Sequence, residues 1–476
     1  MEDNKTEGQK LQEKLFFKAA NVWEKSTEED KKNAFEFCEG YKRFLDTSKT
    51  EREFAHEAGK LARQHGFLSL DDIIKNKKKL VPGMKVYSIH RKKSVLMAII
   101  GQQPIEAGVN IVGAHIDAPR LDLKQNPVYE DTEMALLKTH YYGGIKKYQW
   151  VAIPLSIHGV IVKGNGELIN IVVGEDEIDP VLTITDLLPH LAQEQMAKKM
   201  SEGITGEGLN VLIGSIPFND EKVKEKVKLN ILNLLNQKYG IVEEDFQTAE
   251  LEIVPAFKAK DVGFDRSMIG AYGQDDRVCA YPSLMAAFSL EEVERTSVLI
   301  LTDKEEIGSV GNTGAESNML EDFLANLCAN SSDNYNDIVL RNCLNKSRML
   351  SADVNAGVDP NFDSVNDKKN ATYMGKGVIL QKYTGSRGKS GASDANAEFI
   401  GELRLLFNSK GIIWQTGELG KVDMGGGGTI ALYVANLGVD VIDCGVPVLS
   451  MHAPFEITNK IDVYTSFRAY KVFFES

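Results

Sequence analysis

The chain has 476 residues, 43% of them hydrophobic and 26% charged, which is typical of a globular protein large enough for two domains. The net charge of −13 argues against non-specific nucleic-acid binding, because phosphate contacts need a basic face. No apolar run approaches the ~20 residues of a membrane span, and the N-terminus lacks an apolar signal core. The five cysteines include no CxxC pair, so we expect reduced thiols in a cytoplasmic protein.

The first 66 residues are expected to be helical. The segment Ser26–Glu29 opens one helix with a capping-box pattern, Thr50 with Glu53 opens the next, and Gly66 ends the second of these helices. From about residue 84 the pattern changes to short apolar runs bounded by Gly, Pro and Asn, such as 95–100 and 109–114. Such runs favour buried strands, although a short apolar run can also belong to a helix.

Residues 120–262 differ from the flanking sequence. The runs VAIPLSIHGVIV and ELINIVV flank a turn rich in Gly and Asn and predict an antiparallel hairpin. A helix is expected over Lys222–Lys238, ended by Gly240. From residue 263 helices and apolar strands alternate again. We therefore predict a discontinuous α/β domain, residues 1–119 and 263–476, with a β-rich insert over 120–262.

Four of the predicted strands run into a His or a carboxylate at the C-terminal end. The residues concerned are His115 with Asp117, Asp303 with Glu305 and Glu306, Asp353, and His452. The carboxyl ends of strands in an α/β sheet line the crevice where ligands bind, so we expect these side chains at a common sheet edge. A fifth place, Asp275–Asp276, directly precedes a predicted helix.

Each place also has a purely structural explanation. A His after a strand can be a satisfied core residue, Asp275 can cap the helix that follows, and Asp353 can form an Asx-turn. Glu305 and Glu306 can lie on a solvent-exposed loop. Beside a buried strand, however, the two adjacent acids would repel one another without a cation.

The set as a whole predicts a metal site. Two His and several carboxylates suit Zn²⁺, Mn²⁺ or Co²⁺ better than metals that prefer thiolates. Two metals about 3.5–4 Å apart need a bridging carboxylate and further ligands for each ion. Five ligands with one acid left over fit that requirement, with Glu305 as the general base and Asp117 orienting the imidazole of His115.

Other catalytic signatures are incomplete. The segment Tyr383–Ser390 nearly matches a P-loop, but Tyr383 stands where the first Gly is required. No G-x-S-x-G motif of a serine hydrolase is present. The four consecutive glycines Gly425–Gly428 allow either a close approach of the backbone to a ligand or a tight connection between elements.

Five segments together resemble motifs of the aspartyl aminopeptidase family of dinuclear zinc exopeptidases, in its prokaryotic-type branch. They are, in order, GAHIDAPRLDLK, GQDDR, LTDKEEIGS, LSADVNAG and MHAPFEI. The resemblance covers nearly the whole chain. It implies a three-layer αβα catalytic domain with a mixed sheet, interrupted by a β-rich dimerisation domain. It also implies removal of N-terminal residues from peptides with a free N-terminus.

The resemblance assigns a role to each residue of the expected site, with Zn²⁺ as the first expectation and Mn²⁺ or Co²⁺ as alternatives. The assignments are His115 and Asp353 for one divalent ion, Glu306 and His452 for the other, Asp275 as the bridge, Glu305 as the general base, and Asp117 as the support of His115.

The resemblance further implies self-association, with dimers assembling into a hollow tetrahedral dodecamer. His190 resembles a His that family members insert into the active site of a neighbouring subunit, although it can equally be a structural residue at a helix end. Lys382 resembles a family lysine that meets an acidic side chain of the substrate. Both are therefore candidate substrate-binding residues.

The sequence departs from the eukaryotic branch of the family near the expected pocket. Ala118 replaces a Ser, Asp276 replaces an Asn, and Gly426–Gly428 replace Cys-Gly-Thr. None of these changes touches an expected metal ligand, so the preferred N-terminal residue can be acidic, neutral or basic. Two other functions stay open: a related dinuclear metal carboxypeptidase or deacylase, and a catalytically inactive peptide-binding shell.

Overall fold

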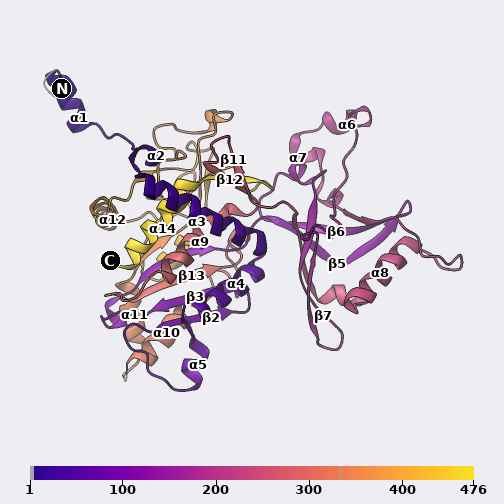
Figure 1. The fold of residues 1–476 in the computed structure, drawn as a ribbon, viewed down its shortest axis with the longest axis horizontal. Coiled ribbons are helices and arrows are strands. Elements are labelled where there is room, and N and C mark those ends of the chain that lie inside the picture. Colours follow the sequence, from indigo (N-terminus) through magenta and orange to yellow (C-terminus); the bar gives the residue numbers. More distant parts are fainter. Residues whose placement is uncertain (1–4, 333) are drawn as a thin grey trace.

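The computed structural model describes residues 5–332 and 334–476, which form two lobes side by side (Figure 1). The larger lobe is built around a seven-stranded sheet, and the smaller lobe around a six-stranded sheet. Among the described residues, no helix combines the length and apolar character needed to cross a membrane.

The seven-stranded sheet is mixed. Its strands, in spatial order, are β1 (Leu68–Ser69), β2 (Lys85–His90), β3 (Ser94–Ile99), β13 (Ser297–Thr302), β4 (Asn110–His115), β14 (Arg348–Ser351) and β20 (Asp440–Asp443). The strands β13, β4, β14 and β20 run parallel to one another, whereas β3 is antiparallel to both β2 and β13. Every residue of β3, β4 and β13 is buried, as expected for strands covered on both faces.

Helices cover both faces of this sheet and so complete three layers. One face packs against α3 (Glu28–Thr47), α4 (Glu51–Gln64), α9 (Gln274–Phe288), α12 (Ala397–Ser409) and α14 (Lys460–Phe474). The other packs against α5 (Leu70–Lys75), α10 (Met319–Ser331), α11 (Asp337–Asn345) and α13 (Ala431–Ala435). Each face has its own cluster of buried apolar side chains, and the predicted three-layer α/β architecture with a mixed sheet is confirmed.

The capping boxes expected at the start of the chain are present. The Thr27 hydroxyl accepts the backbone N–H of Asp30 at the start of α3, and the Thr50 hydroxyl accepts that of Glu53 at the start of α4. Gly66 follows α4 with a φ of 79°, a left-handed conformation that glycine adopts without strain. Before them, α1 (Glu7–Leu15) extends away from the larger lobe (Figure 1), whereas α2 (Val22–Lys25) packs against it through the buried Val22.

A third sheet lies in the larger lobe and corrects one expectation. It comprises β11 (Lys260–Val262), β12 (Met268–Ala271), β22 (Glu456–Asn459), β21 (Pro447–Leu449) and β15 (Asn355–Ala356). The strand β21, which leads to His452, pairs with β15 and β22 and not with the seven-stranded sheet. His452 therefore does not share a sheet edge with the other candidates, because an apolar run identifies a strand without identifying its partners.

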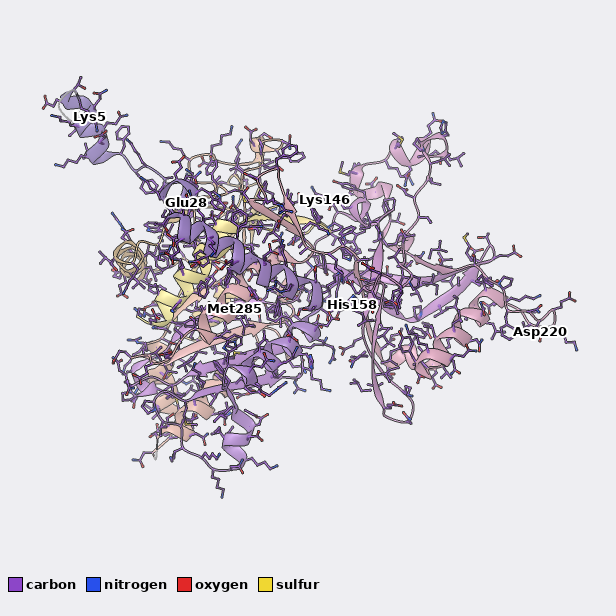
Figure 2. All side chains as sticks on the ribbon, viewed as in Figure 1. Lys5, Glu28, Lys146, His158, Asp220 and Met285 are labelled. Carbon is purple, nitrogen blue, oxygen red and sulfur yellow. The ribbon has the colours of Figure 1, made fainter. Side chains whose placement is uncertain are left out.

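The smaller lobe is formed by residues inserted between β4 and β12. Its sheet has the order β8 (Leu168–Val173), β7 (Leu155–Val162), β10 (Ala249–Pro255), β5 (Arg120–Asp131), β6 (Met134–Tyr142) and β9 (Val211–Gly214). The predicted hairpin is the antiparallel pair β7–β8, and the predicted helix is α8 (Lys226–Tyr239), which ends at Gly240. Figure 2 shows His158 of β7 where the two lobes meet.

Candidate metal centre

Three neighbouring strands bring candidate ligands to one edge of the seven-stranded sheet. The strands β13 and β14 lie on either side of β4 and run parallel to it, so their carboxyl ends meet. His115 ends β4, the short 3₁₀ helix Glu305–Ile307 follows β13, and Asp353 follows β14. Asp275 stands at the start of α9 in an extended conformation before the regular helix begins.

Asp275 lies between the two imidazoles. Its Oδ1 atom is 3.1 Å from Nε2 of His115, and its Oδ2 atom is 3.1 Å from Nε2 of His452. The same Nε2 of His452 is 3.5 Å from Oε2 of Glu306, while Nε2 of His115 is 3.9 Å from Oε2 of Glu305. The structure thus joins His452, which comes from the third sheet, to residues of the seven-stranded sheet.

The opposite nitrogen of each imidazole is already engaged. Nδ1 of His115 lies 3.1 Å from the carbonyl oxygen of Asp117 and 3.3 Å from its Oδ1 atom. Nδ1 of His452 lies 2.8 Å from the carbonyl oxygen of Gly144. A carbonyl oxygen can only accept a hydrogen bond, so the proton belongs on Nδ1 in both rings and the Nε2 lone pairs are left for a cation.

Two overlapping groups of side chains have ligand atoms close enough to share a metal ion. One consists of His115, Asp275 and Glu306, and the other of His115, Asp276 and Asp353; within each group the atoms lie within 4.8 Å of one another. Asp276 is a residue for which the sequence analysis proposed no metal role. Its Oδ2 atom accepts the backbone N–H of His115 at 3.4 Å.

The electrostatics of the site favour a bound cation. Burial raises the pKa of Glu305 to about 7 against the opposing effect of His115, and burial together with Asp275 raises the pKa of Glu306. Burial and Asp276 likewise raise the pKa of Asp353. The Oε1 atom of Glu306 is buried without a hydrogen-bond partner among the described residues. Burying several carboxylates together is costly unless positive charge compensates them, so this donor set fits divalent metal ions.

Glu456 supports the centre and was missed as a site residue. Its buried carboxylate accepts the backbone N–H of His452 at 2.7 Å and that of Asp275 at 3.1 Å. Burial, with the charge of Asp275 nearby, raises its pKa to about 8. Its position four residues after His452 was the one available signal, because the contact with Asp275 spans 181 residues of sequence.

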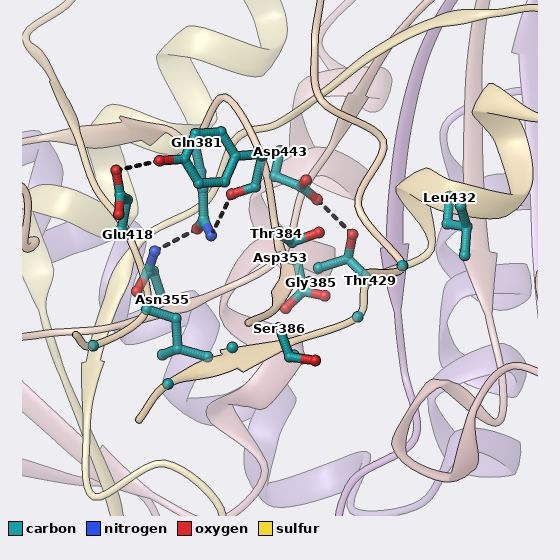
Figure 3. A pocket seen from close by; sticks show the side chains of 18 of the residues that line it. Asp353, Asn355, Gln381, Thr384, Gly385, Ser386, Glu418, Thr429, Leu432 and Asp443 are labelled. Carbon is teal, nitrogen blue, oxygen red and sulfur yellow. Dashed lines mark hydrogen bonds between the residues drawn. The ribbon is translucent and has the colours of Figure 1, made fainter. Parts of the chain in front are cut away.

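A cavity of about 640 Å³ opens onto the centre. One wall of the cavity is formed by two segments, Tyr383–Ser390, which nearly matches a P-loop, and the glycines Gly425–Gly428. The two segments are joined because β17 (Gly385–Ser386) pairs with β19 (Gly426–Gly427). Hydrogen bonds tie the lining together (Figure 3): the Tyr383 hydroxyl donates to Glu418 at 2.6 Å and the Thr429 hydroxyl donates to Asp443 at 2.8 Å. The glycine run therefore lies against the candidate site.

The two candidate substrate-binding residues do not line this cavity in their own chain. His190 is exposed in a short 3₁₀ helix of the insert, Pro189–Leu191. Lys382 is half exposed and forms an ion pair with Asp394 at 2.5 Å, although its neighbours Gln381 and Tyr383 both line the cavity. Their roles stay predictions.

The αβα fold and its buried His and carboxylate side chains fit a metal-dependent hydrolase. Residues 44–474 match the family model described as "Aminopeptidase I zinc metalloprotease (M18)". The chain belongs to this family and is a metallo-aminopeptidase, a hydrolase of peptide bonds, which confirms the resemblance found in the sequence.

Individual relatives agree with this assignment. The chain is 52% identical over 453 residues to "Probable M18 family aminopeptidase 1" of Clostridium acetobutylicum, covering 95% of this chain and 97% of the relative. The crystal structure of an M18-family aminopeptidase from Thermotoga maritima is 45% identical and superposes with a TM-score of 0.91, covering 97% of this chain and 100% of that one. The mApe1 dodecamer of S. cerevisiae, 23% identical, shares the fold with a TM-score of 0.74 over 92% of this chain and 95% of its own.

Proposed function

We propose that this aminopeptidase acts through two divalent metal ions in the centre described above. The observation that carries the proposal is the position of Asp275, which offers one oxygen toward each imidazole. A carboxylate placed in this way can bridge two ions. The proposed ligands are His115 and Asp353 for one ion, Glu306 and His452 for the other, and Asp275 between them.

Zinc is the proposed metal, in line with the description of the family, and Mn²⁺ or Co²⁺ would suit the same donors. When bound, such ions lower the pKa of a water molecule and polarise the scissile carbonyl group. Hydrogen-bond acceptors orient these ligands: the carbonyl of Asp117 holds His115 through Nδ1, and the carbonyl of Gly144 holds His452 in the same way.

Glu305 is the proposed general base. It takes a proton from the attacking water and delivers that proton to the amine that leaves as the new N-terminus. One observation supports this role: its carboxylate stands further from an imidazole, at 3.9 Å, than the carboxylate of Glu306, at 3.5 Å.

Peptides with a free N-terminus are the proposed substrates. The test uses chelator-stripped protein reloaded with Zn²⁺, Mn²⁺ or Co²⁺ and a panel of aminoacyl-p-nitroanilides with acidic, neutral and basic residues. We expect two metal equivalents per chain and cleavage of free amines only. Equal cleavage of N-acetylated substrates would favour a deacylase or carboxypeptidase. Metal binding without activity toward any substrate would favour a peptide-binding shell.

Self-association is proposed on the model of the dodecameric S. cerevisiae relative, with the insert over residues 120–262 as the dimerisation domain. Sedimentation velocity tests this proposal, because a monomer at micromolar concentration would contradict it.

His190 would then act in a neighbouring subunit, and Lys382 would contact an acidic substrate side chain. Mixing His190→Ala with Glu305→Gln protein tests the first role, since complementation requires that a subunit donate its intact His190 to another.

The five buried free cysteines are consistent with a proposed cytoplasmic location.

A further inference from the structure

The insert reaches the metal centre through the end of strand β6. The strand ends at Tyr142, and the two residues that follow it, Gly143 and Gly144, lie against the candidate ligands. Gly143 has a φ of 74°, and a Cβ atom built there would stand 3.3 Å from the Cβ atom of Glu306. The carbonyl of Gly144 accepts the Nδ1–H of His452 at 2.8 Å.

The side chain of Tyr142 contacts the other half of the centre. Its hydroxyl donates a hydrogen bond of 2.8 Å to Oδ2 of Asp117. The same carboxylate accepts the backbone N–H groups of Glu305 at 3.1 Å and Glu306 at 3.2 Å, and lies 3.3 Å from Nδ1 of His115. The shortest of these four contacts thus comes from Tyr142 of the insert, while the other three come from residues of the larger lobe.

Tyr142 is itself held in a fixed position. Its side chain is buried, with 9% of its surface exposed, and the guanidinium of Arg120 lies 3.8 Å from the centre of its ring. Arg120 is in turn paired with Glu51 of α4 and with Glu252 of β10, at 3.4 and 3.3 Å. Burial also raises the pKa of Tyr142, so the phenol stays protonated and remains a donor.

We propose that the segment Tyr142–Gly144 of the insert is a positioning element of the metal centre. Tyr142 fixes the Asp117 carboxylate, and with it the orientation of His115 and of the turn that carries Glu305. Gly144 fixes the ring of His452. The insert therefore completes both halves of the centre, in addition to any role in assembly. This inference rests on the proposed two-metal function.

The test is Tyr142→Phe, which keeps the ring and its contact with Arg120 and removes the hydrogen bond alone. Partners that orient a metal ligand from behind commonly change metal affinity by 10–100-fold, and we expect about a tenfold loss of Zn²⁺ affinity in competition with a chromogenic chelator. We also expect the visible absorption bands of the Co²⁺-loaded protein to shift, because the ligand field at His115 changes. Tyr141→Phe is the matched control, since Tyr141 is the adjacent tyrosine and is 43% exposed.

A second variant separates positioning from general loosening. If Tyr142 acts through Asp117, then Tyr142→Phe should have little further effect on Zn²⁺ affinity in an Asp117→Asn background. Unchanged affinity and an unchanged Co²⁺ spectrum in Tyr142→Phe would overturn the inference, as would equal effects of the two tyrosine variants. Failure of the unmodified chain to bind metal at all would instead refute the proposed function.

Discussion

The residues of the candidate metal centre divide into the proposed metal ligands and the residues that hold these ligands in one orientation. Each imidazole is held through Nδ1 by an acceptor, and each of these acceptors is anchored to a different part of the chain. Glu305 and Glu306 both contact Asp117 through their backbone N–H groups, so that contact restrains neither carboxylate. The proposed base differs from the proposed ligand in the longer distance of its carboxylate from an imidazole, 3.9 Å against 3.5 Å.

Replacing Glu305 by Gln should therefore abolish turnover without removing metal. We expect kcat to fall by about 10²–10⁴-fold, the usual contribution of a general base, with two metal equivalents retained. The measurements are steady-state kinetics and metal analysis by mass spectrometry on the same preparation. Glu316→Gln, the same change at an exposed position nearby, serves as the control. Loss of one metal equivalent from the Glu305 variant would mean that Glu305 is a ligand.

The sequence indicated the residues that end strands better than those that act through long-range contacts. His115, the acids after β13 and Asp353 were all expected at one edge, and the parallel pairing of β13, β4 and β14 brings them there. Tyr142 and Glu456 were missed, because each acts through a contact with a residue far away in sequence. Hydrophobic patterning identifies a strand but does not report such long-range partners.

At the scale of elements, the paired strands β17 and β19 form a cavity wall in which the glycines are not equivalent. Gly426 has a φ of 121°, and a Cβ atom there would overlap the carbonyl oxygen of Gly385. A Cβ atom on Gly427 would only touch the side chain of Leu419, at 3.8 Å. The run of four glycines was expected to permit close approach or a tight turn, and the structure shows close backbone approach at Gly425 and Gly426, of which Gly426 also has a positive φ.

Gly426→Ala should therefore raise KM for aminoacyl-p-nitroanilides, while Gly427→Ala should not. A residue other than glycine in this conformation costs about 1–3 kcal/mol, so the substitution should displace this part of the wall. We expect KM to increase by about tenfold with unchanged metal content. Equal KM values for the two variants would show that this wall does not contact the substrate.

At the scale of the whole molecule, buried charges join the two lobes. The Nζ atom of Lys49, between α3 and α4, lies 2.6 Å from Oε1 of Glu175 in the insert. The same carboxylate oxygen is 3.1 Å from Nε2 of His158, whose Nδ1 atom is 2.7 Å from Oε1 of Glu53. Because Lys49 is only 3% exposed, this cluster fixes the insert to the catalytic lobe only while its charges remain paired.

Glu175→Gln should accordingly destabilise the protein strongly, because it leaves the Lys49 ammonium buried without a counter-charge. Breaking a buried pair in this way costs about 3–5 kcal/mol, which urea unfolding at pH 6 would detect. Glu177→Gln, two residues away and exposed, should leave the unfolding midpoint unchanged. A small effect at both positions would mean that water reaches the junction and screens the pair.

The same cluster predicts how stability depends on pH. His158, Lys49 and Lys258 lower the pKa of Glu175 to about 2 against the effect of burial, so its contribution is present above about pH 4.5 and is lost as pH falls toward 2. Contacts with Glu175 and Glu53 raise the pKa of His158 despite its burial, so its contribution is present below about pH 6.5 and is lost at higher pH.

The difference in unfolding midpoint between wild-type and Glu175→Gln protein should therefore be largest between about pH 4.5 and 6.5 and should narrow below that window. A difference that stays constant from pH 6 to pH 3 would show that the ionised carboxylate of Glu175 does not hold the lobes together.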